Sequence, residues 1–115
     1  MIESIASYVG LPKYMVGIGN GSDQILDIIL ANFASKKTKI LTSNPTFGFF
    51  EERCKLYNIP TIKIPFTKNM TLNTNDFLSK SKQADILYLD SPNNPTGFQF
   101  KKDELARIVS KFDGM

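Results

Sequence analysis

The sequence predicts an α/β fold of three layers, in which helices cover both faces of a mostly parallel β-sheet. Segments of strand character alternate with segments of helical character along the 115 residues. Parallel strands need a crossover between them, usually a helix, and both faces of such sheets are buried. The apolar content of 42% with interspersed charge is typical of one globular domain. We therefore expect residues 1–115 to form a single unit.

Each element is expected from a local pattern of apolar residues. The expected strands lie at 15–19, 39–42, 61–66 and 86–89. The expected helices lie at 2–9, 22–33, 47–57, 75–81 and 102–112. The helix at 22–33 is apolar nearly all round, which indicates burial. The last helix has one apolar stripe, formed by Leu105, Ile108, Val109 and Phe112.

Charge and composition exclude several classes of protein. Fourteen basic and eleven acidic residues leave a net charge of +3, and the densest lysine cluster, Lys36, Lys37 and Lys39, is expected to be solvated surface and not a nucleic-acid site. Cys54 is the only cysteine and histidine is absent, so we expect neither a disulfide framework nor a Cys/His zinc site. Without a signal-peptide pattern or a run of roughly 20 apolar residues, the protein is expected to be cytoplasmic and not to span a membrane.

Three polar turns follow expected strands. In open parallel sheets, ligands bind outside the carboxyl ends of the strands, where the chain turns into the next helix. The turns are Gly19-Asn20-Gly21-Ser22-Asp23, Asn44-Pro45-Thr46-Phe47-Gly48 and Ser91-Pro92-Asn93-Asn94-Pro95-Thr96-Gly97. We expect any binding site to be built from these turns.

The first turn suits a phosphate group. Its small residues let the backbone approach a ligand, and the helix that follows presents unpaired N–H groups at its positive end. An ordinary N-cap, with Ser22 or Asp23 accepting from the first-turn amides, is the alternative. Spacing excludes a dinucleotide fingerprint, because Ser22 stands where a third glycine would be needed and no acidic residue ends the next strand.

The other two turns carry an aromatic ring and an amide. Phe47 follows Pro45 and Thr46 at the same edge of the sheet, where its ring can stack on a flat ligand; core packing is the alternative, since two further phenylalanines lie beside it. Asn94 lies between two prolines, and a rigid bend there can aim its amide at a ligand. A purely structural turn is the alternative for this segment.

Together and in this order, the motifs GNGSD, NPTFGFF and LDSPNNPTG resemble those of the fold-type I pyridoxal-phosphate aminotransferases, most closely the histidinol-phosphate aminotransferase group. The resemblance covers nearly the whole chain and implies that residues 1–115 are the N-terminal part of the large domain that binds pyridoxal 5'-phosphate. It implies that the backbone amides of Gly21, Ser22 and Asp23 hold the cofactor phosphate. It further implies that Phe47 stacks on the pyridine ring and that Asn94 hydrogen-bonds the phenolic oxygen.

The resemblance also implies an activity for the complete enzyme. Such an enzyme would transfer an amino group between histidinol phosphate, or a related amino acid or amine, and 2-oxoglutarate, and would be a homodimer. Relative to the family, the chain is expected to be truncated at both ends, so that its Schiff-base lysine is absent.

Four Ser-Lys pairs occur in the chain, but none has the sequence context that the family gives to that lysine. We therefore expect surface charge at Lys36, Lys80, Lys82 and Lys111. No catalytic residue and no metal ligand is expected, and the chain alone is expected to be inactive. The alternative function is a non-catalytic remnant that binds a ligand or another protein. Because unpaired strand edges and uncovered apolar helices favour association, we also expect self-association or marginal folding.

Overall fold

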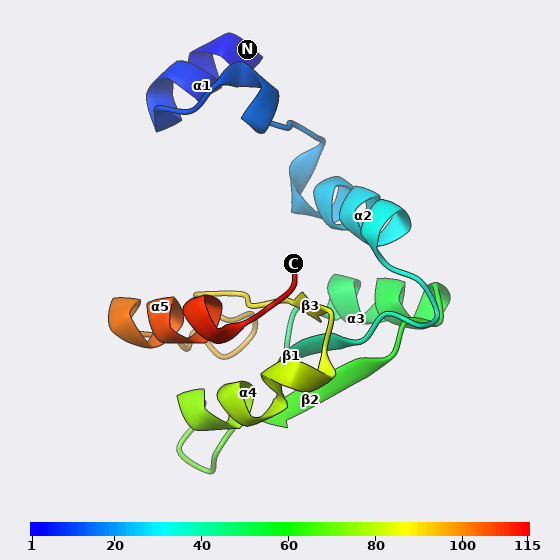
Figure 1. Ribbon diagram of the computed structural model, residues 1–115, viewed down its shortest axis with the longest axis vertical. Coiled ribbons are helices and arrows are strands. Elements are labelled where there is room, and N and C mark those ends of the chain that lie inside the picture. The colour runs from blue at the N-terminus through cyan, green and yellow to red at the C-terminus, as the bar shows by residue number, and fades with distance from the viewer.

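Strand β1 (Ile40–Asn44) is the centre of a three-stranded parallel sheet in the computed structural model, which describes residues 1–115 (Figure 1). It pairs with β2 (Thr61–Pro65) on one side and with β3 (Ile86–Leu87) on the other. The helices are α1 (Ile2–Val9), α2 (Gly21–Phe33), α3 (Gly48–Leu56), α4 (Thr74–Lys80) and α5 (Lys102–Lys111), with short 3-10 helices η1 (Lys13–Met15) and η2 (Ser81–Gln83). The predicted α/β class and parallel sheet are confirmed.

The side chains of β1 alternate between two cores, one on each face of the sheet. Ile40 packs with Leu30 of α2 and Phe50 of α3. Its neighbour Leu41 packs on the other face with Phe77 of α4 and with the α5 residue Ile108. Because successive residues of a strand point to opposite faces, the two cores give the three layers that the sequence predicts.

The helices after β1 and β3 lie on opposite faces of the sheet. The chain leaves β1 through α3 to reach β2, and then crosses through α4 to reach β3 on the far side of β1. Right-handed crossovers in opposite directions place their helices on opposite faces. The turns after the adjacent strands β1 and β3 therefore diverge. The place where neighbouring strands lead to helices on opposite faces is the switch point of the sheet, and in open α/β sheets ligands bind in the crevice there.

Two expectations for the N-terminal third are wrong. The predicted strand at 15–19 is not formed: residue 15 ends η1, and residues 16–19 are a connection with no strand beside it. Its apolar pattern is that of a strand, but a strand also needs a neighbour that accepts its hydrogen bonds. Helix α2 forms as predicted but is not buried all round, because it packs mainly on α3; Leu30 is buried, whereas Ile28 and Phe33 are 48% and 59% exposed.

The two ends of the chain lie in different surroundings. Helix α1 contacts η1 and stands away from the sheet, while the C-terminus reaches the sheet beside β3 (Figure 1). There the Leu87 N–H donates to the carbonyl of Met115 (2.8 Å), and the Met115 N–H donates to that of Asp85 (3.1 Å). The edge of β3 that faces away from β1 is therefore partly paired. No helix has both the length and the apolar character that a membrane crossing requires.

Candidate functional site

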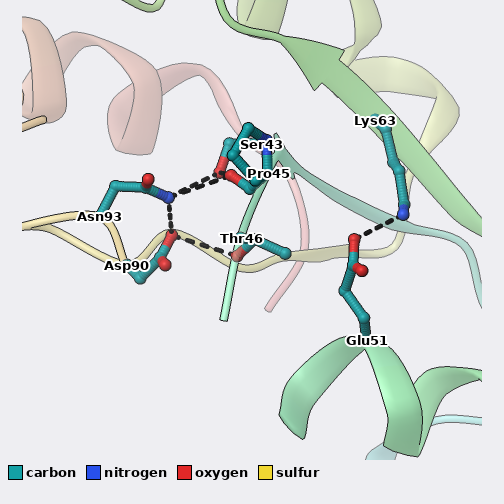
Figure 2. A network of polar contacts seen from close by, with 7 residues as sticks. All are labelled: Ser43, Pro45, Thr46, Glu51, Lys63, Asp90 and Asn93. Carbon is teal, nitrogen blue, oxygen red and sulfur yellow. Dashed lines mark hydrogen bonds and ion pairs between the residues drawn. The ribbon is translucent and has the colours of Figure 1, made fainter. Parts of the chain in front are cut away.

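A single carboxylate joins the turns that follow β1 and β3. Asp90 lies just beyond β3, and its Oδ1 accepts from the Thr46 hydroxyl (3.2 Å) and from the Asn93 amide (2.9 Å). Its Oδ2 accepts from the backbone N–H of Asn94 (2.9 Å). Figure 2 shows Thr46 and Asn93 converging on this carboxylate from the two turns. The Asp90 carboxylate therefore connects the two turns, and its bond to Thr46 joins residues that are 44 positions apart in the sequence.

Asn93 is the buried asparagine of the third turn, with 3% of its surface exposed. Besides Asp90, its amide donates to the Pro45 carbonyl (3.2 Å) and to the Ser43 hydroxyl (3.3 Å), as Figure 2 shows. Its own carbonyl accepts from the Thr96 backbone N–H (3.2 Å). A buried polar side chain with this many partners is satisfied inside the protein, so Asn93 fixes the turn and offers nothing to a ligand.

Asn94 has the opposite surroundings. Its backbone N–H is held by Asp90, while its side chain is exposed and its amide has no partner within the chain. This arrangement leaves the Asn94 amide available to a ligand, as the predicted role requires.

An open groove brings together residues from all three turns. Ser22 of the first turn, Phe47 of the second and Asn94 of the third line the same depression, which has a volume of about 320 Å³. The remaining lining residues are Ile25, Leu26, Tyr88 and Asp90. Of the five residues predicted to bind the cofactor, three line this groove. The other two, Gly21 and Asp23, lie beside Ser22 in the first turn of α2 but do not line it.

The start of α2 presents free backbone donors. The helix begins at Gly21, where φ is +76°, and its N-cap residue Asn20 makes no side-chain cap. The N–H groups of Ser22 and Asp23 find no acceptor in the connection before the helix, and no side chain accepts from them. The alternative of Ser22 or Asp23 as an N-cap is therefore not observed, since both lie inside the helix. A Cβ atom at Gly19 would lie 2.7 Å from the Cδ1 atom of Ile25, so a side chain there would displace the end of the Ile25 side chain.

Phe47 packs on the core, as the alternative interpretation expected, and its position at the groove leaves the stacking role open. It is half-buried and packs against the core between the sheet and α2 and α3, with its ring centroid 6.2 Å from that of Phe49. It also lines the groove. Because core packing holds the Phe47 ring in place, the part of the ring that lines the groove is a rigid surface on which a flat ligand can stack.

Tyr88 forms part of the groove wall and is held by stacking. Its ring lies 3.6 Å from that of Phe50, with 14° between the planes. Burial, together with the negative charge of Asp90 and the nearby Cys54, raises the pKa of Tyr88 to about 12. Its hydroxyl therefore stays protonated at neutral pH and adds no negative charge to the groove.

The buried thiol lies elsewhere. Cys54 and Thr42 line a small cavity of about 40 Å³ between α3 and the sheet, beside the Lys63–Glu51 ion pair drawn in Figure 2. That volume has room for a water molecule, not for a cofactor. Burial, with a smaller effect of Glu51, raises the pKa of the Cys54 thiol to about 11, so it is protonated at neutral pH.

The lysines of the Ser-Lys pairs stand apart from the groove. All four are exposed, and none is among the residues that line it. Their predicted place on the surface is confirmed. No group of three or more His, Cys, Asp or Glu side chains is arranged to hold a metal ion.

Sequence reasoning missed Asp90, Asn93 and Thr46. Asp90 had a usable signal, because an acidic residue directly after an apolar strand lies at the edge of the sheet where ligands bind. Asn93 could not be told from Asn94 by residue type. Their roles differ only because one amide points at the second turn and the other at solvent.

Residues 1–114 match the family of class I and II aminotransferases. The chain belongs to this family. A histidinol-phosphate aminotransferase of Pyrococcus furiosus is 32% identical over 107 residues, which are 93% of this chain and 31% of that protein. The chain therefore spans about a third of the length of the curated relatives that it matches.

Solved structures of aminotransferases share the fold. The histidinol-phosphate aminotransferase of Clostridium acetobutylicum superposes with a TM-score of 0.79 at 26% identity, over 94% of this chain and 31% of that one. That of Sinorhizobium meliloti, solved in complex with pyridoxal-5'-phosphate, gives a TM-score of 0.86 at 18% identity, over 97% of this chain and 31% of that one. The resemblance of the three turn motifs to aminotransferases is thus confirmed for family and fold.

Proposed function

We propose that this chain is the cofactor-binding part of a pyridoxal 5'-phosphate-dependent aminotransferase. The observation that carries the proposal is the groove at the switch point, where a helix N-terminus, an aromatic ring and a free amide converge from three turns. Each of these features matches one part of the cofactor: its phosphate, its ring and its phenolic oxygen. Membership of the aminotransferase family supports the same assignment.

The residues present fit the phosphate end of the cofactor. The free N–H groups of Ser22 and Asp23 lie at the positive end of a 13-residue helix, and Ser22 lines the groove. A helix N-terminus with unpaired donors is a favourable anion site. Gly21 adopts a left-handed conformation that side chains disfavour, and the open space around it leaves the backbone accessible.

The residues also fit the ring end. Phe47 can cover one face of a pyridine ring, and the free Asn94 amide can donate to the phenolic oxygen. Together with the helix dipole, these contacts supply roughly 3–5 kcal/mol before ordering costs, which corresponds to millimolar affinity or weaker. When bound, the cofactor supplies an electron sink for reactions at an amino-bearing carbon.

The chain's own part in the reaction is to bind and orient. Asn94 would hold the ring in the plane that Phe47 sets, and the start of α2 would fix the phosphate. Proton transfer needs a base beside the reacting carbon, and no lysine lines the groove. We therefore assign that role to a lysine outside residues 1–115. For the complete protein we propose amino transfer between histidinol phosphate, or a related amine or amino acid, and 2-oxoglutarate.

A titration of the chain with pyridoxal 5'-phosphate, followed residue by residue by NMR, tests the binding part. We expect the amide signals of Ser22 and Asp23 and the side-chain amide of Asn94 to shift together, with weak affinity. Asn94→Ala should weaken binding about tenfold, since it removes one hydrogen bond to a charged group. Asn69→Ala is the matched control, because Asn69 is an exposed asparagine in the loop between β2 and α4. Shifts spread over the surface lysines instead would contradict the site.

The activity is tested on the complete protein. Histidinol phosphate and 2-oxoglutarate should yield glutamate, and substitution of Asn94 should reduce kcat/KM. Failure with this donor but turnover with another amino acid would retain the reaction class and correct the substrate.

A non-catalytic ligand-binding role is the second candidate, favoured by the exposure of all four Ser-Lys lysines. Borohydride reduction of a mixture of the chain and pyridoxal 5'-phosphate tests whether a lysine of this chain attaches the cofactor covalently. Stoichiometric labelling of one lysine would show that the chain itself carries the attachment site. Scattered, substoichiometric labelling is the result we expect.

We further propose that the complete protein is a cytoplasmic homodimer, as the family resemblance implies. Size-exclusion chromatography with light scattering on the complete protein tests the dimer, and fractionation of cells tests the location.

A further inference from the structure

The turns that form the groove are held in place by Asp90. The second turn supplies Thr46, directly before Phe47, and the third supplies Asn93 and Asn94. The two turns leave adjacent strands and lead to helices on opposite faces of the sheet, so no continuous element connects them at this edge. The Asp90 carboxylate contacts both of them, and Asn93 adds a second link to Pro45.

Two of the three hydrogen bonds to Asp90 fix the backbone at or beside a residue that faces the ligand. Thr46 is 4% exposed and donates its hydroxyl to Asp90, which fixes the backbone immediately before the Phe47 ring. Asn94 donates its own backbone N–H to the other carboxylate oxygen, so its side chain projects from an anchored point. One rigid carboxylate thus sets where the ring and the amide stand relative to one another.

An amide cannot replace this carboxylate. Oδ1 and Oδ2 both accept, and together they receive three donors. An asparagine side chain has one accepting oxygen, so its NH₂ group would face a donor from Thr46, Asn93 or Asn94. Hydrogen bonds to charged groups are also stronger than those to neutral ones.

We propose that Asp90 is a positioning residue for the cofactor ring: it fixes the Phe47 ring and the Asn94 amide at one separation, without itself holding the phosphate. This inference rests on the proposed function. It assigns to Asp90 an effect on the ring end of the ligand only, because the phosphate end is formed by the start of α2, with which Asp90 makes no hydrogen bond.

The test compares Asp90→Asn with Asp85→Asn in the full chain. Asp85 lies just before β3 and also accepts from a backbone N–H, that of Lys39 (2.8 Å), but at the opposite end of the strand. We expect hydrogen exchange of the Asn94 backbone N–H to accelerate about tenfold in Asp90→Asn and to be unchanged in Asp85→Asn. Pyridoxal 5'-phosphate binding should weaken about tenfold in the first variant only.

Inorganic phosphate is the second probe, because it reports the helix terminus alone. Its dissociation constant should not rise in Asp90→Asn, because the substitution leaves the start of α2 in place and only removes a negative charge from the groove wall. Equal weakening of both ligands would mean that the substitution disturbs the whole chain and would overturn the positioning role. Unchanged Asn94 exchange would overturn it as well.

Thr46→Val tests the same role of Asp90 if the Asp90→Asn variant does not fold. Valine has the shape of threonine but cannot donate to Asp90. We expect weaker pyridoxal 5'-phosphate binding with Asn94 exchange unchanged, because the contact of Asp90 to Asn94 remains; unaltered binding would count against the role. If the wild-type chain shows no response to pyridoxal 5'-phosphate, the proposed function fails, and Asn94 exchange still decides whether Asp90 holds the turn.

Discussion

Thr42 and Ser43 are neighbours on β1 with the same burial, but their hydroxyls have different partners. Each is 1% exposed. The Ser43 hydroxyl donates to the Pro45 carbonyl (3.1 Å) and accepts from Asn93, which ties β1 to the turn after it. Thr42 lines the small cavity beside Cys54, and its buried hydroxyl has no hydrogen-bond partner. A buried hydroxyl without a partner carries a desolvation cost that nothing offsets.

Removing each of these hydroxyls should therefore change the free energy of unfolding in opposite directions. Thr42→Val should raise the free energy of unfolding by about 1 kcal/mol, because it removes the unpaired hydroxyl and keeps the shape. Ser43→Ala should lower it by about 1 kcal/mol, because a paired hydroxyl is lost. Urea denaturation at neutral pH measures both. A loss of stability in Thr42→Val would indicate that a water molecule in the cavity pairs with the hydroxyl.

The half-buried hydroxyl of Tyr88 and the buried thiol of Cys54 predict a loss of stability in alkali. A pKa that folding raises means that the protonated form is favoured in the native state, so the contribution is complete below the unfolded pKa and is lost as pH rises through the folded one. For Cys54 the window runs from 9.0 to about 11, and for Tyr88 from 10.0 to about 12. We expect urea midpoints to fall across this range and to fall less in Tyr88→Phe.

Tyr14→Phe is the control for that experiment, because Tyr14 is exposed on η1 and away from both cores. An equal slope in wild type and Tyr88→Phe would show that Tyr88 is not the group that titrates.

At the scale of elements, α2 is attached to the rest of the molecule by one side of its surface. Leu30 is its buried residue. Asp27 adds polar contacts to α3 and the turn after it, accepting from the Tyr57 hydroxyl (2.9 Å) and pairing with Arg53 (3.4 Å). The start of α2 forms the phosphate end of the groove, so these contacts decide where the free N–H groups of Ser22 and Asp23 stand.

Leu30→Ala should release this helix. Truncation of a buried leucine costs about 2–5 kcal/mol, and the loss here should also weaken binding of inorganic phosphate by displacing the helix terminus. Ile28→Ala is the matched control, since Ile28 lies on the same helix and is 48% exposed. Thermal unfolding and a phosphate titration measure the two effects. Equal effects of the two substitutions would contradict the attachment through Leu30.

The molecule as a whole exposes apolar surface at its N-terminal end. Ile2, Ile5, Tyr8 and Val9 of α1 are all exposed, and α1 stands apart from the sheet (Figure 1). The outer edge of β2 is also unpaired. Contiguous apolar surface and open strand edges both favour contacts between molecules.

We therefore predict concentration-dependent self-association in sedimentation velocity. The double substitution Ile5→Lys with Val9→Lys should shift the distribution toward the monomer, because the two positions are one helical turn apart on the same face. Val109→Lys is the control, as Val109 is an exposed apolar residue on α5. A compact monomer of the wild-type chain at all concentrations would contradict the prediction.

Local patterns predicted most of the sheet and the turns that line the candidate groove. The apolar run at 86–89 and the Pro- and Asn-rich turn after it are signals within a few residues. Of the strand predicted at 86–89, only Ile86–Leu87 forms β3, and the turn follows it. Contacts between distant segments were not predictable in the same way. Asp90 meets Thr46 only because β1 and β3 are adjacent, and the segment at 15–19 fails as a strand only because nothing pairs with it.

The alternation of β1 has a consequence for changes of length in this protein. Ile40 and Leu41 belong to different cores, and Ser43 reaches Asn93 from the same strand. Deleting one residue from β1 would exchange the two cores and turn Ser43 away from Asn93 at once. The polar loop at 67–71, which packs on neither core, should accept insertions and deletions that this strand cannot.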